Sequence, residues 1–132
     1  PASQIKTSYI EDALIAEGCW IEDADIRESV VGLRSQIRSG CKLHRTIMMG
    51  ADYYGFFRWG KESDEDLFLG LGRDCDIEGA IIDKNAKVGR GTVIRPFPQE
   101  EEMDSELYCV RDGIVVIPKG TVIPPYTRIA PD

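Results

Sequence analysis

The sequence is poor in the residues that most metal sites and disulfide frameworks depend on. Its 132 residues include a single histidine, His44, and four cysteines, none of which forms a CxxC pair. We expect no zinc site, because zinc sites usually combine closely spaced cysteine and histidine ligands. A disulfide framework is not expected either, since that device belongs mainly to smaller secreted domains.

Long apolar segments and an excess of positive charge are missing too. No apolar run approaches the roughly 18 residues of a membrane span, and the first residues lack the charged-then-apolar pattern of a secretory signal. The formal net charge is −7, whereas a nucleic-acid-binding surface needs a basic face. We therefore expect no membrane and no nucleic acid among the partners. The chain starts at Pro1 rather than methionine, as expected of a fragment or a processed product.

The sequence has instead a recurrent series of aliphatic residues that advances by five or six positions. Its members are Ile15, Ile21, Ile26, Val31, Ile37, Leu43 and Met49, then Leu71, Ile77, Ile82, Val88 and Ile94, and finally Ile117, Ile123 and Ile129. On an α-helix, members six residues apart would lie about 240° from one another and could not form one apolar stripe. A single flat strand would have to run for about forty residues, against the usual five or six. Short strands joined by regular corners satisfy the series.

A second periodic position carries small side chains. Three or four residues after an aliphatic member lie Cys19, Ala24, Ser29, Ser35, Cys41, Cys75, Ala80, Ala86, Thr92, Thr121 and Thr127. This is the hexapeptide-repeat pattern of a parallel β-helix, in which three units make one triangular coil of about 18 residues. The prediction is an all-β fold: a single-stranded parallel β-helix of about four to five coils, with the aliphatic residues inside and open ends that need a cap. The period does not determine the hand of the coil, but proteins with hexapeptide repeats are known for the left-handed form.

Two segments interrupt the period and are predicted to be inserted loops outside the solenoid. Residues 50–70 are rich in aromatic side chains, which either fold back over the coil or form an interface, where aromatic residues are enriched. These side chains are Tyr53, Tyr54, Phe56, Phe57 and Trp59. Residues 95–113 contain an acidic run, which we interpret as a solvated face. Its members are Glu100, Glu101, Glu102 and Asp104.

Several strings resemble the ADP-glucose pyrophosphorylases of plants and cyanobacteria. They are SVVGLRS (29–35), MGADYY (49–54), IIDKNAKVG (81–89) and GIVVIPKGTVIP (113–124), and IAEGCWIEDADI (15–26) is similar to the first β-helix coil of that family. Hexapeptide repeats alone are shared with many acyltransferases, whereas IIDKNA and MGADYY together are much more specific. By this resemblance, residues 1–132 are identified as one left-handed β-helix domain, without the family's N-terminal nucleotidyltransferase domain.

The resemblance implies a role in regulation and assembly. The family makes ADP-glucose and pyrophosphate from ATP and glucose 1-phosphate in starch or glycogen synthesis, and it works as a homo- or heterotetramer. Its phosphate-binding loop and metal-binding acids lie in the other domain. This chain alone should therefore be inactive and have no catalytic residue, metal or cofactor, whereas the full-length enzyme uses Mg²⁺ and ATP. The expected location is the plastid in a plant or alga and the cytoplasm in a cyanobacterium.

Two lysines match the family's effector site. Lys84 occupies the lysine of IIDKNA, and Lys119 occupies the lysine that follows GIVVIP. In the family both resemble ligands of small anionic effectors, with 3-phosphoglycerate as activator and phosphate as inhibitor. A lysine ammonium is a compact charge suited to such anions, although most lysines are simply solvated. The stretch RPFPQEEE (95–102) departs from the family's usual NKD-type sequence, which leaves subunit type and effector strength open.

Three alternative functions fit parts of the pattern. A stand-alone hexapeptide acyltransferase would use a catalytic histidine at a subunit interface, but His44 directly follows Leu43 and should point outward. A metal-dependent β-helix hydratase would need three histidines around zinc. A purely structural assembly module differs from the regulatory domain only in that its lysines bind no ligand.

Overall fold

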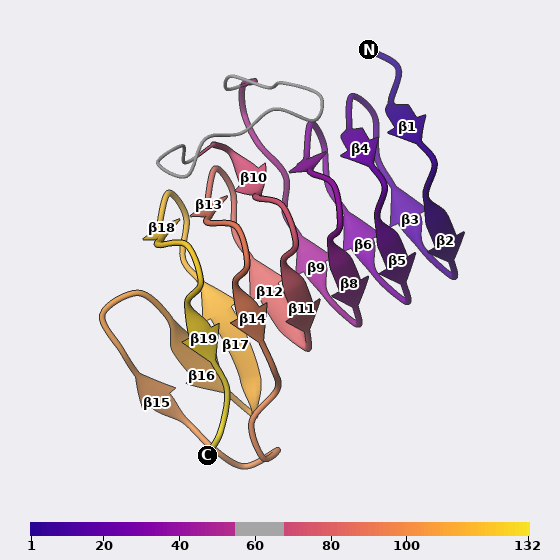
Figure 1. Ribbon diagram of the computed structural model, residues 1–132. Coiled ribbons are helices and arrows are strands. Elements are labelled where there is room, and N and C mark those ends of the chain that lie inside the picture. Colours follow the sequence, from indigo (N-terminus) through magenta and orange to yellow (C-terminus); the bar gives the residue numbers. More distant parts are fainter. Residues whose placement is uncertain (55–67) are drawn as a thin grey trace.

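Short strands wound into a solenoid make up the computed structural model, which describes residues 1–54 and 68–132 (Figure 1). Successive strands belong in turn to three sheets, and nearly all neighbours within a sheet are parallel. The predicted all-β parallel β-helix is therefore confirmed. No helix that could cross a membrane occurs among these residues.

Each sheet collects one strand from every complete coil. The first sheet contains β1 (Gln4–Lys6), β4 (Trp20–Glu22), β7 (Gln36–Ile37), β10 (Gly70–Leu71), β13 (Lys87–Val88) and β18 (Val122–Ile123). The second contains β2 (Tyr9–Glu11), β5 (Asp25–Arg27), β8 (Lys42–His44), β11 (Asp76–Glu78), β14 (Val93–Ile94) and β19 (Arg128–Ile129). The third contains β3 (Leu14–Ile15), β6 (Val30–Val31), β9 (Ile47–Met48), β12 (Ala80–Ile82) and β17 (Ile114–Ile117), followed by β16 (Cys109–Arg111) and β15 (Met103–Asp104).

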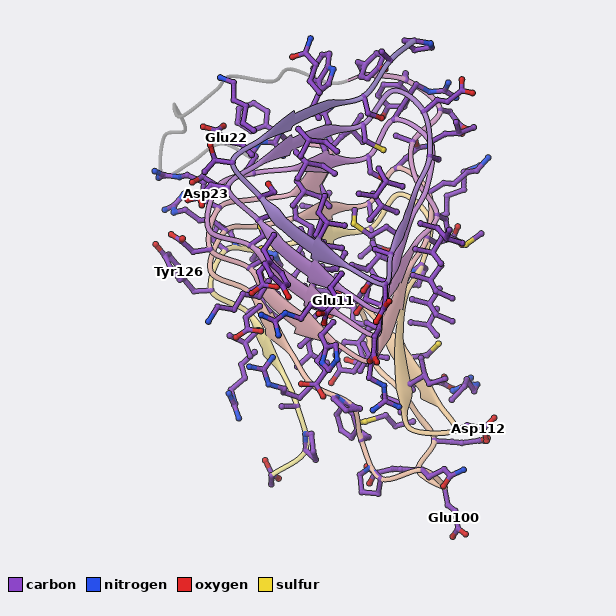
Figure 2. The ribbon with its side chains drawn as sticks, turned by 90° about the vertical axis from the view of Figure 1, so that its right-hand side faces the viewer. Glu11, Glu22, Asp23, Glu100, Asp112 and Tyr126 are labelled. Carbon is purple, nitrogen blue, oxygen red and sulfur yellow. The ribbon has the colours of Figure 1, made fainter. Side chains whose placement is uncertain are left out.

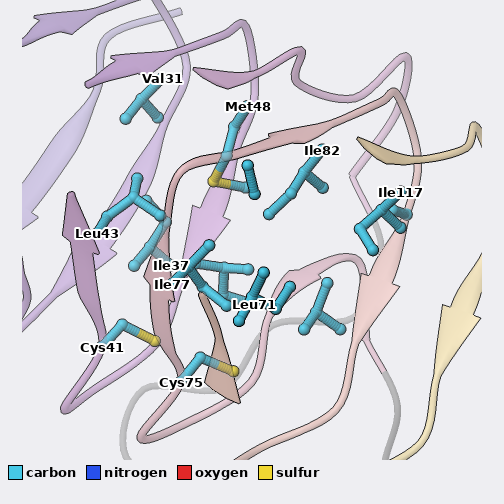
Figure 3. Close-up of a cluster of buried hydrophobic side chains, with 14 of the residues drawn as sticks. Val31, Ile37, Cys41, Leu43, Met48, Leu71, Cys75, Ile77, Ile82 and Ile117 are labelled. Carbon is cyan, nitrogen blue, oxygen red and sulfur yellow. The ribbon is translucent and has the colours of Figure 1, made fainter. Parts of the chain in front are cut away.

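The aliphatic residues of the repeat form three columns inside the solenoid. The strand register aligns Ile21, Ile37, Leu71, Val88 and Ile123 in the first sheet, Ile26, Leu43, Ile77, Ile94 and Ile129 in the second, and Val31, Met48, Ile82 and Ile117 in the third. Each of these side chains is at most 3% exposed. Figure 3 shows part of the columns, including Val31, Met48, Ile82 and Ile117 of the third sheet. Burial of one such side chain contributes about 1.5–3 kcal/mol, so the columns contribute strongly to the stability of the fold.

Two details of the predicted repeat were wrong. Met48, and not Met49, belongs to the interior column, and Met49 is 46% exposed. The repeat also begins before Ile15, because β1 and β2 add Ile5 and Ile10 to the columns. The described residues form five complete coils, in agreement with the predicted four to five, and β18 and β19 add a partial sixth coil.

Small residues fill the space beside the columns, as predicted. Cys19, Cys41 and Cys75 are buried and carry free thiols. Burial raises the pKa of the Cys19 and Cys41 thiols, because an apolar interior disfavours the thiolate. These cysteines therefore act as compact apolar groups rather than as reactive nucleophiles.

The second insertion is more ordered than the predicted loop. Its β16 pairs antiparallel with β17, and β15 pairs antiparallel with β16. Val110 of β16 is fully buried in the core, so β16 takes the place of a third parallel strand in the last coil. The acidic run of residues 100–102 is exposed, as predicted, and Figure 2 shows Glu100 at the far tip of this insertion.

Candidate functional site

Lys84 and Lys119 lie in equivalent turns of neighbouring coils. Lys84 is in the turn between β12 and β13, and Lys119 is in the turn between β17 and β18. The residue that follows each lysine has positive φ, 62° at Asn85 and 72° at Gly120, which bends the chain from the third sheet into the first. The Gly120 N–H donates a 2.9 Å hydrogen bond to the Lys84 carbonyl oxygen. The fold thus brings together two exposed lysines that are distant in sequence.

These turns belong to a ridge that runs along the solenoid where the third sheet meets the first; we call it the corner ridge. One backbone hydrogen bond links each turn to the next. The N–H groups of Arg34, Ala51, Asn85 and Gly120 donate to the carbonyl oxygens of Glu17, Leu33, Gly50 and Lys84, in that order. The bonded carbonyls mark equivalent turn positions. An acid, an apolar residue and a glycine occupy the first three, and among the described residues lysine occupies this position at 84 and 119. Arg34 adds a further cation one residue along its turn, where its Nε donates a 2.9 Å hydrogen bond to the Ala51 carbonyl oxygen.

Asp52 is the residue of this region that sequence reasoning missed. Its Oδ1 lies 3.2 Å from Lys84 Nζ, and its Oδ2 accepts a 3.1 Å hydrogen bond from Asn85 Nδ2. Its backbone N–H donates a 2.8 Å hydrogen bond to Asn85 Oδ1. Only its place in MGADYY could have pointed to it, because the contact depends on how the first insertion leaves the turn.

The charges around Asp52 favour its ionised form. Hydrogen bonds from Asn85 and Lys84 lower the pKa of the Asp52 carboxyl group, and the positive charge of Lys119 lowers it further. Both lysines therefore act on the same carboxylate. The side chains of Lys84 and Asp52 are 45% and 46% exposed, so solvent and dissolved ions reach the pair.

Neighbouring groups fix the turn that carries Lys84. The Asp83 Oδ1 accepts a 2.6 Å hydrogen bond from the Lys84 backbone N–H, and the Asn85 N–H is held by Gly50 of the preceding coil at 3.1 Å. Asparagine tolerates the left-handed backbone conformation better than most residues. The backbone under Lys84 is thus fixed on two sides, while its ammonium group stays at the surface.

The start of the first insertion folds back onto the same ridge. Tyr54 stacks on Trp20, with ring centroids 4.6 Å apart, and its hydroxyl donates a 2.9 Å hydrogen bond to the Gly18 carbonyl oxygen. Gly18 has a φ of 73°, and a Cβ there would meet the Tyr54 hydroxyl at 2.5 Å. For Tyr54, folding back over the coil is therefore the correct alternative. Phe56, Phe57 and Trp59 lie outside the described residues.

His44 points outward from β8, as predicted. Its side chain is 45% exposed, and Nε2 lies 3.1 Å from Glu28 Oε2. In residues 1–54 and 68–132 no group of three or more His, Cys, Asp or Glu side chains could hold a metal ion. The corner ridge carries two exposed lysine ammonium groups and the Asn85 side-chain amide, and this chemistry suits an anion carrying phosphate or carboxylate.

The model of the GLGC left-handed parallel β-helix domain matches residues 1–127. The match includes Asp52, Lys84 and Lys119, and it agrees with the stacked parallel strands described above. It also supplies the left hand of the coil that the period alone leaves open.

Proposed function

The chain belongs to the family of GLGC left-handed parallel β-helix domains, and on that premise we propose that it is an effector-binding and subunit-assembly domain. Domains of this family belong to glucose-1-phosphate adenylyltransferase, a nucleotidyltransferase. In this proposal an N-terminal catalytic domain forms ADP-glucose and pyrophosphate from ATP and glucose 1-phosphate with Mg²⁺. The β-helix by itself forms no ADP-glucose, and the full-length enzyme responds to anions that the β-helix helps to bind.

The observation that carries the effector role is the pairing of Lys84 and Lys119 on the corner ridge. Neighbouring strands of a sheet lie about 4.8 Å apart, so ammonium groups on adjacent coils can reach a single anion. The lowered pKa of Asp52 supports this, because one carboxylate already feels both lysines. Small anions with phosphate and carboxylate groups, such as 3-phosphoglycerate and inorganic phosphate, fit this charge.

The test is an activation curve for 3-phosphoglycerate on full-length enzyme. Lys84→Ala and Lys119→Ala should each raise the concentration that gives half-activation, while basal activity persists because the chemistry takes place in the other domain. Lys42→Ala is the matched control, since Lys42 is an exposed lysine on the outer face of β8. Unchanged half-activation in both ridge variants would leave this domain a purely structural module.

Two surfaces support the assembly role. The inward residues Ile5 and Ile10 of the first coil are 46% and 38% exposed, because among the described residues no coil stacks on their outer side. Figure 1 shows the N-terminus at this end and the C-terminus at the other. We assign the open end to the catalytic domain in cis, because a domain joined before Pro1 would emerge beside it, and burying these side chains would be favourable.

The second surface is an aliphatic stripe on the outer face of the third sheet. The register aligns Leu14, Val30, Ile47, Ile81 and Val116 in one row. The corresponding row of the second sheet carries Tyr9, Asp25, Lys42, Asp76, Val93 and Arg128, which are mostly polar or charged. We assign the stripe to a second β-helix subunit that presents the same row, because two uncharged aliphatic stripes are complementary to each other.

A further inference from the structure

The Asp52 carboxylate is held in the way a bound anion would be held. Each of its oxygens has one cationic or N–H partner, Lys84 Nζ at 3.2 Å and Asn85 Nδ2 at 3.1 Å. An ionised carboxylate only accepts hydrogen bonds, and a phosphate at this place would use the same donors. The chain thus supplies an anion of its own to the lysine that the proposed function assigns to an effector.

Asp52 keeps its position without help from Lys84. Its backbone N–H donates to Asn85 Oδ1 at 2.8 Å, and the neighbouring Ala51 N–H donates to the Leu33 carbonyl oxygen at 2.8 Å. The backbone that carries this carboxylate is therefore fixed close to the ammonium group even when the ion pair opens. A tethered group of this kind competes at a high effective concentration.

The ion pair is weak enough to be exchanged. Both side chains are close to half exposed, and exposed pairs of this kind contribute little net stability because water and salt screen them. A free anion with two or more charges gains more from Lys84 and Lys119 together than a single carboxylate gains from Lys84. Such an anion can displace Asp52 without any rearrangement of the coil.

We propose that Asp52 is an internal competitor at the corner ridge, which occupies Lys84 in the unliganded chain and lowers the affinity of the ridge for small phosphate-bearing anions. The proposal rests on the proposed function, because it concerns the same two lysines. It adds a residue that sets the affinity of the site. It also predicts a preference for anions of higher charge, because a monovalent carboxylate gains no more from Lys84 than the Asp52 carboxylate that it displaces.

The experiment is a titration of the chain with inorganic phosphate at constant ionic strength, followed by the amide NMR shifts of Asn85 and Gly120. Asp52→Asn removes the charge and leaves the backbone hydrogen bond to Asn85 in place. We expect it to tighten phosphate binding about two- to fivefold, the range that corresponds to the usual worth of an exposed ion pair. Asp52→Ser, also uncharged, should act in the same direction.

Asp112→Asn is the matched control for net charge. Asp112 is an exposed acid at the opposite end of β17 from Lys119, near the tip of the insertion in Figure 2. It should leave phosphate affinity nearly unchanged. An equal gain in Asp112→Asn would show that only the overall charge matters and would overturn the competition. In a Lys84→Ala background, the gain from Asp52→Asn should largely disappear, since the competition acts through that lysine.

The outcomes separate this inference from the function it rests on. If Lys84→Ala weakens phosphate binding but Asp52→Asn brings no gain, Asp52 is not a competitor, although the ridge still binds anions. If neither the unaltered chain nor Asp52→Asn binds phosphate, the competition is excluded. If phosphate binds but Lys84→Ala has no effect on it, the effector role of the lysine fails as well.

Discussion

Adjacent residues of one strand have opposite roles in this solenoid. Side chains alternate between the two faces of a strand, and in β12 this places Ile82 inside, between Met48 and Ile117, while Ile81 belongs to the outer stripe. Ile82 is 2% exposed, and its column continues through every complete coil. The same alternation keeps His44 outside next to the buried Leu43. The chemistry of a residue type therefore matters less than the face on which it lies.

Ile82 gives a direct test of the interior column. Ile82→Val should lower the free energy of unfolding by about 0.5–1.5 kcal/mol, because it removes one buried methylene group. Ile82→Asp should cost several kcal/mol, because it places a carboxylate among aliphatic side chains without a partner. Urea unfolding followed by circular dichroism measures both. Ile81→Asp is the matched control and should cost far less; equal losses at the two positions would mean that Ile82 is not interior.

Lys84 and Lys119 show which parts of the candidate site could be predicted from the sequence. Composition and periodicity place Lys84 and Lys119 only outside the aliphatic columns, where most lysines are solvated. The resemblance of IIDKNA and GIVVIP to a known family singled them out, and the coil geometry then brought them onto one ridge. Asp52 could not be found in this way, because its contact with Lys84 depends on three-dimensional stacking of turns from different coils.

At the scale of elements, the strands were predictable wherever the chain keeps its period. The interior members from Ile21 to Leu43 and from Leu71 to Ile94 were placed correctly, because the five- or six-residue spacing and the small residues agree. Met49 was wrong because two methionines are adjacent and a five-residue unit cannot be told from a six-residue unit there. The insertion of residues 95–113 hid β16, since an antiparallel strand that enters from outside the repeat leaves no periodic signal.

β16 completes the last coil and should therefore contribute to stability. Val110 is fully buried and packs in the same core as the columns. Val110→Ala should lower the free energy of unfolding by about 1.5–3 kcal/mol, from two lost methyl-sized groups and the cavity they leave. Glu101→Ala in the same insertion should change it by no more than about 0.5 kcal/mol, because Glu101 is exposed. Thermal unfolding of the two variants compares them, and equal stability would show that the insertion is only an appendage.

At the scale of the whole molecule, the three faces of the solenoid differ in character. The second sheet presents charged and polar side chains to solvent, among them Asp25, Lys42 and Asp76. The third sheet presents the aliphatic stripe, and the corner ridge beside it carries the two lysines. A subunit that covers the stripe would lie next to the proposed anion site, so assembly and effector binding would involve neighbouring parts of the surface.

The stripe can be tested by charge substitution. In Ile47→Lys and Ile81→Lys, the long aliphatic stem can lie along the sheet and keep the ammonium group in water, so the coil should fold normally. In an interface the same ammonium group would lose its hydration without a partner, which is costly. Sedimentation velocity of the full-length enzyme should therefore show a shift from the assembled form to smaller species.

Val122→Lys is the control for this substitution. Val122 is an exposed aliphatic residue on the outer face of β18 in the first sheet, so the new charge is the same but the face is different. Its sedimentation should match that of the unaltered enzyme, and circular dichroism should show the same β structure in all three variants. If the two stripe variants assemble as well as Val122→Lys does, no subunit covers the third sheet. The aliphatic row would then serve only the cross-strand packing of neighbouring coils, in which β-branched side chains stabilise adjacent strands.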